Sequence, residues 1–151
     1  MKKPISALLV YDQSNSLDAL KLALELQFIR TLQAQNCREA WHALSGANPP
    51  HLVFTGTTLA DGTWAEVLVL AARAPAFVNV IVVGGLPDTK FYVQVIERGA
   101  FDFIAPPFAG PELAHVVRCA AANVLSRRNA RARFERSGSY PPLSRSEPIS
   151  N

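Results

Sequence analysis

Short apolar runs alternate with segments of helical periodicity along this chain, and this alternation limits the possible folds more than any other feature. Five runs predict strands, at residues 6–12, 28–34, 51–56, 79–85 and 100–105. Helical patterns at 16–27, 37–46, 64–74 and 87–99 follow the first four runs, and a fifth begins at Gly110. Because most of the strands are continuously apolar, both faces of a parallel sheet must be covered. We therefore predict an α/β fold with a doubly wound, five-stranded parallel sheet and helices on both faces.

Residues that favour helix ends support these boundaries. They are Ser16 and either Asp88 or Thr89 as amino-terminal caps, and Gly46 and Gly99 just after helices. The run at 28–34 alternates more than the others, which is typical of a strand near a sheet edge. In a doubly wound sheet, ligands and chemistry collect beyond the carboxyl ends of the strands. The functional residues are therefore expected at that edge.

The positive net charge comes from one end of the chain. Residues 1–117 carry 8 Lys and Arg against 10 Asp and Glu, a net charge of −2. Residues 118–136 carry 6 Arg and one Glu, a net charge of +5, and the Ser- and Pro-rich stretch that follows has little to bury. We predict a domain over 1–126, a basic helical extension over 127–136 and a disordered tail over 137–151.

Composition also limits the compartment and the chemistry. The two cysteines, Cys37 and Cys119, have no metal-site spacing and make no disulfide framework, so a reducing cytoplasm is expected. No apolar run approaches the ~20 residues of a membrane span. The amino terminus has lysines and a short apolar run, but Asp12 interrupts it and no cleavage site follows, so we predict no signal peptide.

Five segments together carry a family resemblance. They read "LLVYDQ", "AQNCREAWHAL", "PPHLVFTGTTLADGTWAEVL", "VIVVGG" and "GAFDFIAPPF". In this order and spacing, residues 4–126 resemble the receiver domain of response regulators, the phosphoacceptor module of two-component signalling. The resemblance implies the flavodoxin-like (βα)5 receiver fold. It also places Pro107 after a cis peptide bond, which X-Pro bonds adopt most readily.

The resemblance locates the family's phosphorylation site, and most of that site is missing here. The family has two acids after the first strand, a phosphoacceptor Asp after the third, a Ser or Thr after the fourth, and a Lys before the final Pro-Phe. The matching residues are Tyr11, Asp12, Gly56, Gly84 and Pro106. Glycine has no carboxylate to act as nucleophile, and Asp12 alone is a poor site for Mg²⁺. The resemblance therefore implies a degenerate pseudo-receiver, for which we expect no enzyme activity, no metal and no cofactor.

Two alternatives for this edge stay open. Thr55, Thr57, Thr58 or Asp61, all near Gly56, could accept a phosphoryl group in its place. The glycines at 56, 84 and 85 could instead admit a small ligand, because glycine permits close backbone approach. However, the chain has neither G-x-x-x-x-G-K nor G-x-G-x-x-G, the usual phosphate-binding patterns.

The resemblance implies a role in signal transduction through protein–protein interaction. Family partners bind the last two helices and the last strand, about residues 88–125 here, where Phe91, Tyr92, Phe101 and Phe103 supply aromatic side chains. We expect the partner to be a kinase, a regulator or a second copy of the chain.

A basic arm suggests another class of partner. It consists of Arg127, Arg128, Arg131, Arg133 and Arg136. Clustered arginines bind the phosphates of nucleic acids, so a nucleic-acid-associated regulator is the alternative function. A solvated helix end, where positive charge is favoured, explains the same cluster without any ligand.

Overall fold

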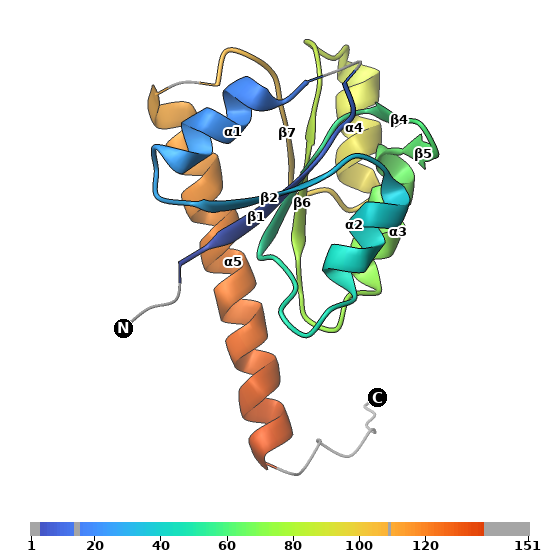
Figure 1. Ribbon diagram of the computed structural model, residues 1–151. Coiled ribbons are helices and arrows are strands. Elements are labelled where there is room, and N and C mark those ends of the chain that lie inside the picture. Colours follow the sequence, from blue (N-terminus) through green and yellow to red (C-terminus); the bar gives the residue numbers. More distant parts are fainter. Residues whose placement is uncertain (1–3, 14–15, 109, 138–151) are drawn as a thin grey trace, which may run out of the picture.

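The computed structural model describes residues 4–13, 16–108 and 110–137 (Figure 1). Its main sheet has five parallel strands in the order β2-β1-β3-β6-β7. Their bounds are β1 (Ser6–Val10), β2 (Arg30–Ala34), β3 (Leu52–Thr55), β6 (Asn79–Val83) and β7 (Asp102–Ile104). This confirms the predicted doubly wound fold, and β2 is an edge strand as its alternating sequence indicated.

Five helices cover both faces of the sheet (Figure 1). They are α1 (Asp18–Glu25), α2 (Cys37–Leu44), α3 (Trp64–Ala72), α4 (Thr89–Glu97) and α5 (Gly110–Ser137). Helices α1 and α5 pack on one face, where their leucines, valines and alanines meet side chains of β1, β3 and β6. Helices α2 and α3 pack on the other face, and α4 joins them through Val95. The central strands β3 and β6 are buried along their whole length, which explains their continuous apolar sequence.

A small hairpin between β3 and α3 was not predicted. Strands β4 (Thr58–Leu59) and β5 (Gly62–Thr63) pair antiparallel with two residues each. Thr63 then begins α3 with a capping box, in which its hydroxyl and the Glu66 carboxylate satisfy backbone N–H groups. The segment that follows the third main strand is therefore an ordered element and not a plain loop.

Several predicted boundaries need correction. Ser16 does not cap α1, because the cap position is Leu17 and no side chain bonds there; the Ser16 hydroxyl instead accepts a hydrogen bond from the Asp18 N–H. The strand expected from residue 28 begins at Arg30 because the backbone at Phe28 is left-handed. Asp88 does cap α4, accepting from the backbone N–H of Phe91 at 2.8 Å.

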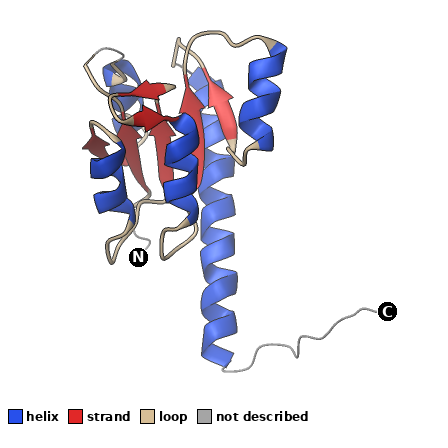
Figure 2. Ribbon diagram, turned by 90° about the vertical axis from the view of Figure 1, so that its right-hand side faces the viewer, coloured by secondary structure: helices blue, strands red, loops and turns tan. Residues whose placement is uncertain are grey.

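The carboxyl-terminal helix extends beyond the sheet against which it packs. Helix α5 has 28 residues, so it is about 40 Å long, and its lower half projects beyond the body of the molecule (Figures 1 and 2). The basic arm lies on this helix, while the predicted tail, apart from Ser137, lies outside the described residues. No helix within the described ranges has the length and hydropathy to span a bilayer.

Candidate functional site

The fold brings the predicted site positions to one edge of the sheet. Tyr11, Gly56 and Gly84 directly follow β1, β3 and β6, and each continues the backbone hydrogen bonding of the sheet. The Gly56 N–H donates to the Val10 carbonyl at 2.9 Å, and the Gly84 N–H donates to the Ile104 carbonyl at 3.1 Å. Pro106 lies just beyond β7, and its bond to Pro107 is cis, as predicted.

Tyr11 occupies the first acidic position of the family as a buried, neutral side chain. It is 5% exposed, and its hydroxyl donates to Asp18 Oδ1 at 2.7 Å while accepting from the Gln33 amide. Burial, and then the Asp18 carboxylate, raise the pKa of Tyr11 to about 12. The same hydrogen bond, followed by one to Ser16, lowers the pKa of Asp18. Asp18 and Gln33 were not predicted as site residues, because their residue types give no sign of this contact.

The phosphoacceptor position has no nucleophile in the structure. Gly56 is buried at the end of β3, and the neighbouring Thr55 side chain is also fully buried. The Thr55 hydroxyl donates to the Gly56 carbonyl at 3.0 Å, so its hydrogen is already used in a bond to the backbone at the end of β3. Thr55 therefore does not present its oxygen to a phosphodonor.

An aromatic ring fills the space beside Gly84. A Cβ atom at this position would lie 3.1 Å from the Thr57 methyl carbon and 3.2 Å from Cζ of Phe103. Phe103 is held in place by Phe91, whose ring makes edge contacts with both Phe103 and Trp64 at centroid distances of 5.7 and 5.8 Å. A Ser or Thr side chain at position 84 therefore requires its neighbours to move.

Asp61 has a structural partner instead of a free carboxylate. Its oxygens accept from the backbone N–H groups of Cys37 at 2.8 Å and Arg38 at 3.2 Å. These bonds cap the start of α2 from the β4–β5 hairpin, and they lower the pKa of Asp61. Burial, and then the Asp61 charge, raise the pKa of Cys37 to about 11, so this thiol stays protonated and unreactive.

A small polar pocket lies where the first two strands end. It has a volume of about 260 Å³ and is lined by Tyr11, Asp12, Gln13, Ser16, Asp18, Gln33 and Gln35. Mg²⁺ prefers several oxygen ligands around one or two carboxylates and a phosphate. Of the two carboxylates here, Asp18 is bound to the Tyr11 hydroxyl, and Gly56 adds none. No group of three or more His, Cys, Asp or Glu side chains suited to a metal occurs among the described residues. The donor set therefore does not fit the magnesium site of the receiver family.

The structure places one of the four aromatic residues predicted for the partner surface in the core. Phe103 is 8% exposed and lies in the core, and Phe91 and Phe101 are partly buried against it. Only Tyr92 of the four is exposed, at 41%, and its hydroxyl lies 3.4 Å from Asp102. Phe91 and Phe103 pack with Val95, the one buried residue of α4, whereas Phe101 packs against the core beneath α1 and α5.

The basic arm is also more structural than predicted. Arg128 reaches back to the body and donates to the carbonyls of Phe77 at 2.8 Å, Pro50 at 2.7 Å and Pro49 at 3.3 Å. The Arg127 guanidinium lies 4.7 Å from the centre of the Phe77 ring.

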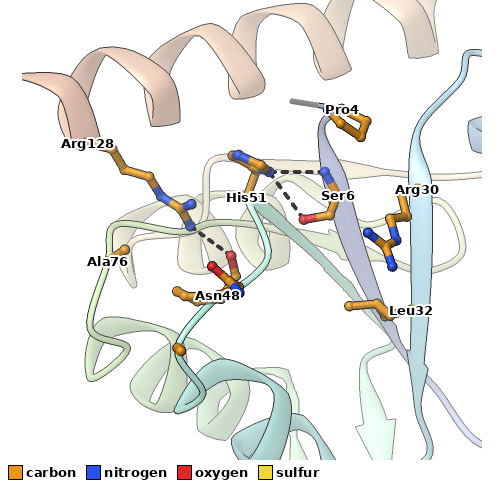
Figure 3. Close-up of a pocket in the computed structure, with 10 residues that line it drawn as sticks. Pro4, Ser6, Arg30, Leu32, Asn48, His51, Ala76 and Arg128 are labelled. Carbon is orange, nitrogen blue, oxygen red and sulfur yellow. Dashed lines mark hydrogen bonds between the residues drawn. The ribbon is translucent and has the colours of Figure 1, made fainter. Parts of the chain in front are cut away.

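Figure 3 shows Arg128 extending from α5 toward the loops that precede β3, beside a cavity of about 560 Å³. Further along α5, Arg131 pairs with Glu135, and Arg133 is exposed. The Arg136 side chain lies outside the described residues. The arginines closest to the body therefore anchor α5.

Comparisons with known proteins agree on the architecture. The structure is similar to a CheY-like response regulator receiver domain protein from Methanospirillum hungatei JF-1, with a TM-score of 0.68 and 20% identity over 82% of this chain and 98% of that one. A response regulator receiver domain protein from Clostridium thermocellum matches with a TM-score of 0.67 and 21% identity, covering 79% of this chain and 95% of that one. NtrX from Brucella abortus matches at 0.71 and 24% over 94% of this chain but 32% of its own length. No protein-family model matches the sequence, and no curated protein matches it.

The architecture and the position of the site define the class: a doubly wound α/β domain whose candidate site lies at the carboxyl ends of its parallel strands. More narrowly, the fold is that of response regulator receiver domains.

Proposed function

We propose that this protein is a cytoplasmic signalling domain of the receiver type that acts by protein–protein interaction and is not phosphorylated at the usual position. The observation that carries the proposal is the neutral edge of the sheet. Gly56 supplies no carboxylate, and the Asp18 carboxylate already accepts a 2.7 Å hydrogen bond from the Tyr11 hydroxyl. An aspartyl phosphate needs a carboxylate nucleophile, and its formation needs a metal to neutralise charge.

Under this proposal the domain is not an enzyme and uses no cofactor. Its place in two-component or phosphorelay signalling is that of a recognition module, whose output depends on the presence of its partner. The unfavourable donor set around Asp12 and the occupied hydroxyl of Thr55 both support this proposal.

Treatment with a small phosphodonor tests the proposal directly. The full chain is incubated with acetyl phosphate and Mg²⁺, and intact mass is measured before and after acid treatment. We expect no added phosphoryl group, whereas an active receiver domain treated in parallel gains one. A stoichiometric adduct on this chain would refute the proposal, and mapping it to Thr57, Thr58 or Asp61 would identify a non-standard acceptor.

A further inference from the structure

Phe28 lies in the turn after α1 and has a backbone conformation that bulky residues rarely adopt. Its φ is 63°, its N–H donates to the Glu25 carbonyl at 3.0 Å, and the next N–H, of Ile29, donates to Leu24 at 3.1 Å. This pair of bonds is a Schellman motif, whose left-handed position normally holds glycine. The Phe28 side chain is also 90% exposed, so packing within its own chain does not compensate for the strain.

Further apolar side chains are exposed on α1, in the turn after it and on α5. Leu22 of α1 is 60% exposed, Leu26 in the turn is 73% exposed, and Leu125 of α5 is 46% exposed. Taking about 150–200 Å² for a fully exposed large side chain, Phe28 and these three residues together expose about 400–540 Å². The largest apolar patch on a soluble monomer has about this size and is often functional.

A groove opens beside the turn that carries Phe28. It has a volume of about 640 Å³ and lies between the turn after α1 and helix α5. Gln27 and Ile29, the neighbours of Phe28 in the chain, form part of its wall. Its lining is apolar apart from Gln27, His51 and Arg118, and includes Ile5, Ile29, Val117, Ala121, Ala122 and Leu125. A protruding aromatic side chain and an apolar recess therefore belong to one surface, which we call the α1–α5 face.

We propose that the α1–α5 face is a homodimer interface, in which Phe28 of each copy inserts into the groove of the other. A two-fold interface uses the same surface on both subunits, so that surface must carry both the protruding group and its recess. The four exposed side chains supply about half to two-thirds of the ~800 Å² that each subunit buries in a standard interface, and the groove walls can supply the rest. The retained strain at Phe28 then has a reason, because the ring is buried by the partner.

The proposed dimer interface lies away from the degenerate edge of the sheet. Helix α1 starts after the carboxyl end of β1 and leads back to the start of β2, so Phe28 lies at the opposite end of the parallel sheet from Tyr11 and Gly56. The inference rests on the proposed function in taking protein binding as the output, and it names the partner as a second copy. Association should then be independent of any phosphodonor.

Sedimentation equilibrium of the full chain over a wide concentration range tests the interface. Phe28→Asn removes the ring but suits the left-handed conformation, and Ala122→Glu puts a charge into the groove at an exposed helical position. Leu86→Asn is the matched control, since Leu86 is 93% exposed and is not among the groove residues. We expect the wild type to dimerise, both interface variants to weaken the dimer at least tenfold, and the control to leave it unchanged.

Mixing the two interface variants gives a second test of the proposed interface. A mixed dimer keeps one intact contact, because the Phe28 of the Ala122→Glu copy meets the unaltered groove of the Phe28→Asn copy. We therefore expect the mixture to associate more tightly than either variant alone.

Several results would overturn the inference. They are a wild type that stays monomeric to about 1 mM, a Phe28→Asn dimer as tight as the wild type, or an equal loss with Leu86→Asn. Thermal unfolding of dilute, monomeric Phe28→Asn checks that its fold is intact. Repeating the measurement with acetyl phosphate separates the two proposals: tighter association on phosphorylation refutes the proposed function but not the interface.

Discussion

Replacing Arg128 tests whether the basic arm is an anchor or a ligand-binding element. In the structure its guanidinium bonds two separate loops, through the Phe77 carbonyl at 2.8 Å and the Pro50 carbonyl at 2.7 Å. A hydrogen bond from a charged donor contributes roughly 1.5–3 kcal/mol, and the half-buried site lets water replace part of it. We therefore expect Arg128→Ala to reduce the free energy of unfolding by about 2–3 kcal/mol.

The assay is urea and thermal unfolding followed by circular dichroism. For a chain of this size, a loss of about 2 kcal/mol lowers Tm by about 4–8 °C. Arg128→Lys should lose most of the same stability, because one ammonium group cannot bond both loops in the way a guanidinium does. Arg133→Ala is the control, since Arg133 is exposed on the same helix and its removal should change stability by less than ~0.5 kcal/mol. Equal effects of Arg128→Ala and Arg133→Ala, or no effect of either, would refute the anchoring role.

The same reasoning decides how the nucleic-acid alternative is tested. Truncation before residue 127 removes Arg128, so loss of DNA binding by a truncated chain would report unfolding as readily as a lost contact. Arg133→Glu avoids this difficulty because it changes the charge of the projecting helix and leaves the anchor in place. Duplex DNA binding that falls steeply with salt and is lost in Arg133→Glu would favour the nucleic-acid function.

Three further predictions concern the edge of the sheet and the hairpin beside it. The pKa of Tyr11 is raised from its ordinary value near 10 to about 12. Its contribution to stability is therefore complete below pH 10 and disappears as the pH rises to about 12. Tyr11→Phe should reduce the loss of stability measured between these two pH values. Gly84→Ala should cost about 1 kcal/mol in urea unfolding because its Cβ would crowd the Phe103 ring, and Phe103→Leu should make the added methyl easier to accept in a double-mutant cycle. Asp61→Ala should cost about 1 kcal/mol because the N–H groups of Cys37 and Arg38 lose their carboxylate acceptor, while Asn36 still caps α2 through the Glu39 N–H. Since the Asp61 pKa is lowered, the wild type keeps this contribution above the ordinary carboxyl pKa and loses it as the pH falls through the folded value, whereas the variant should lack that acid-dependent part.

Local patterns in the sequence were enough to predict the sheet. Continuous apolar runs identified the buried strands β3 and β6, and stronger alternation of apolar and polar residues identified the edge strand β2. Contacts between distant residues were not predictable in this way. Asp61 caps a helix 24 residues earlier in the chain, and Arg128 bonds a carbonyl 78 residues away, so neither side chain shows its role in its own segment. Aromatic content likewise could not show that Phe103 faces the core.

The altered residues at the sheet edge are physically consistent with one another. An acid at position 11 would place a second carboxylate beside Asp18, whereas the Tyr11 hydroxyl donates to Asp18 and stays neutral. Because Gly56 supplies no carboxylate, a lysine at the exposed position 106 would have little negative charge to pair with. The missing hydroxyl at Gly84 leaves room that Phe103 fills. The residues at this edge therefore pack consistently without a phosphorylation site. Protein binding can then involve other surfaces, such as the α1–α5 face.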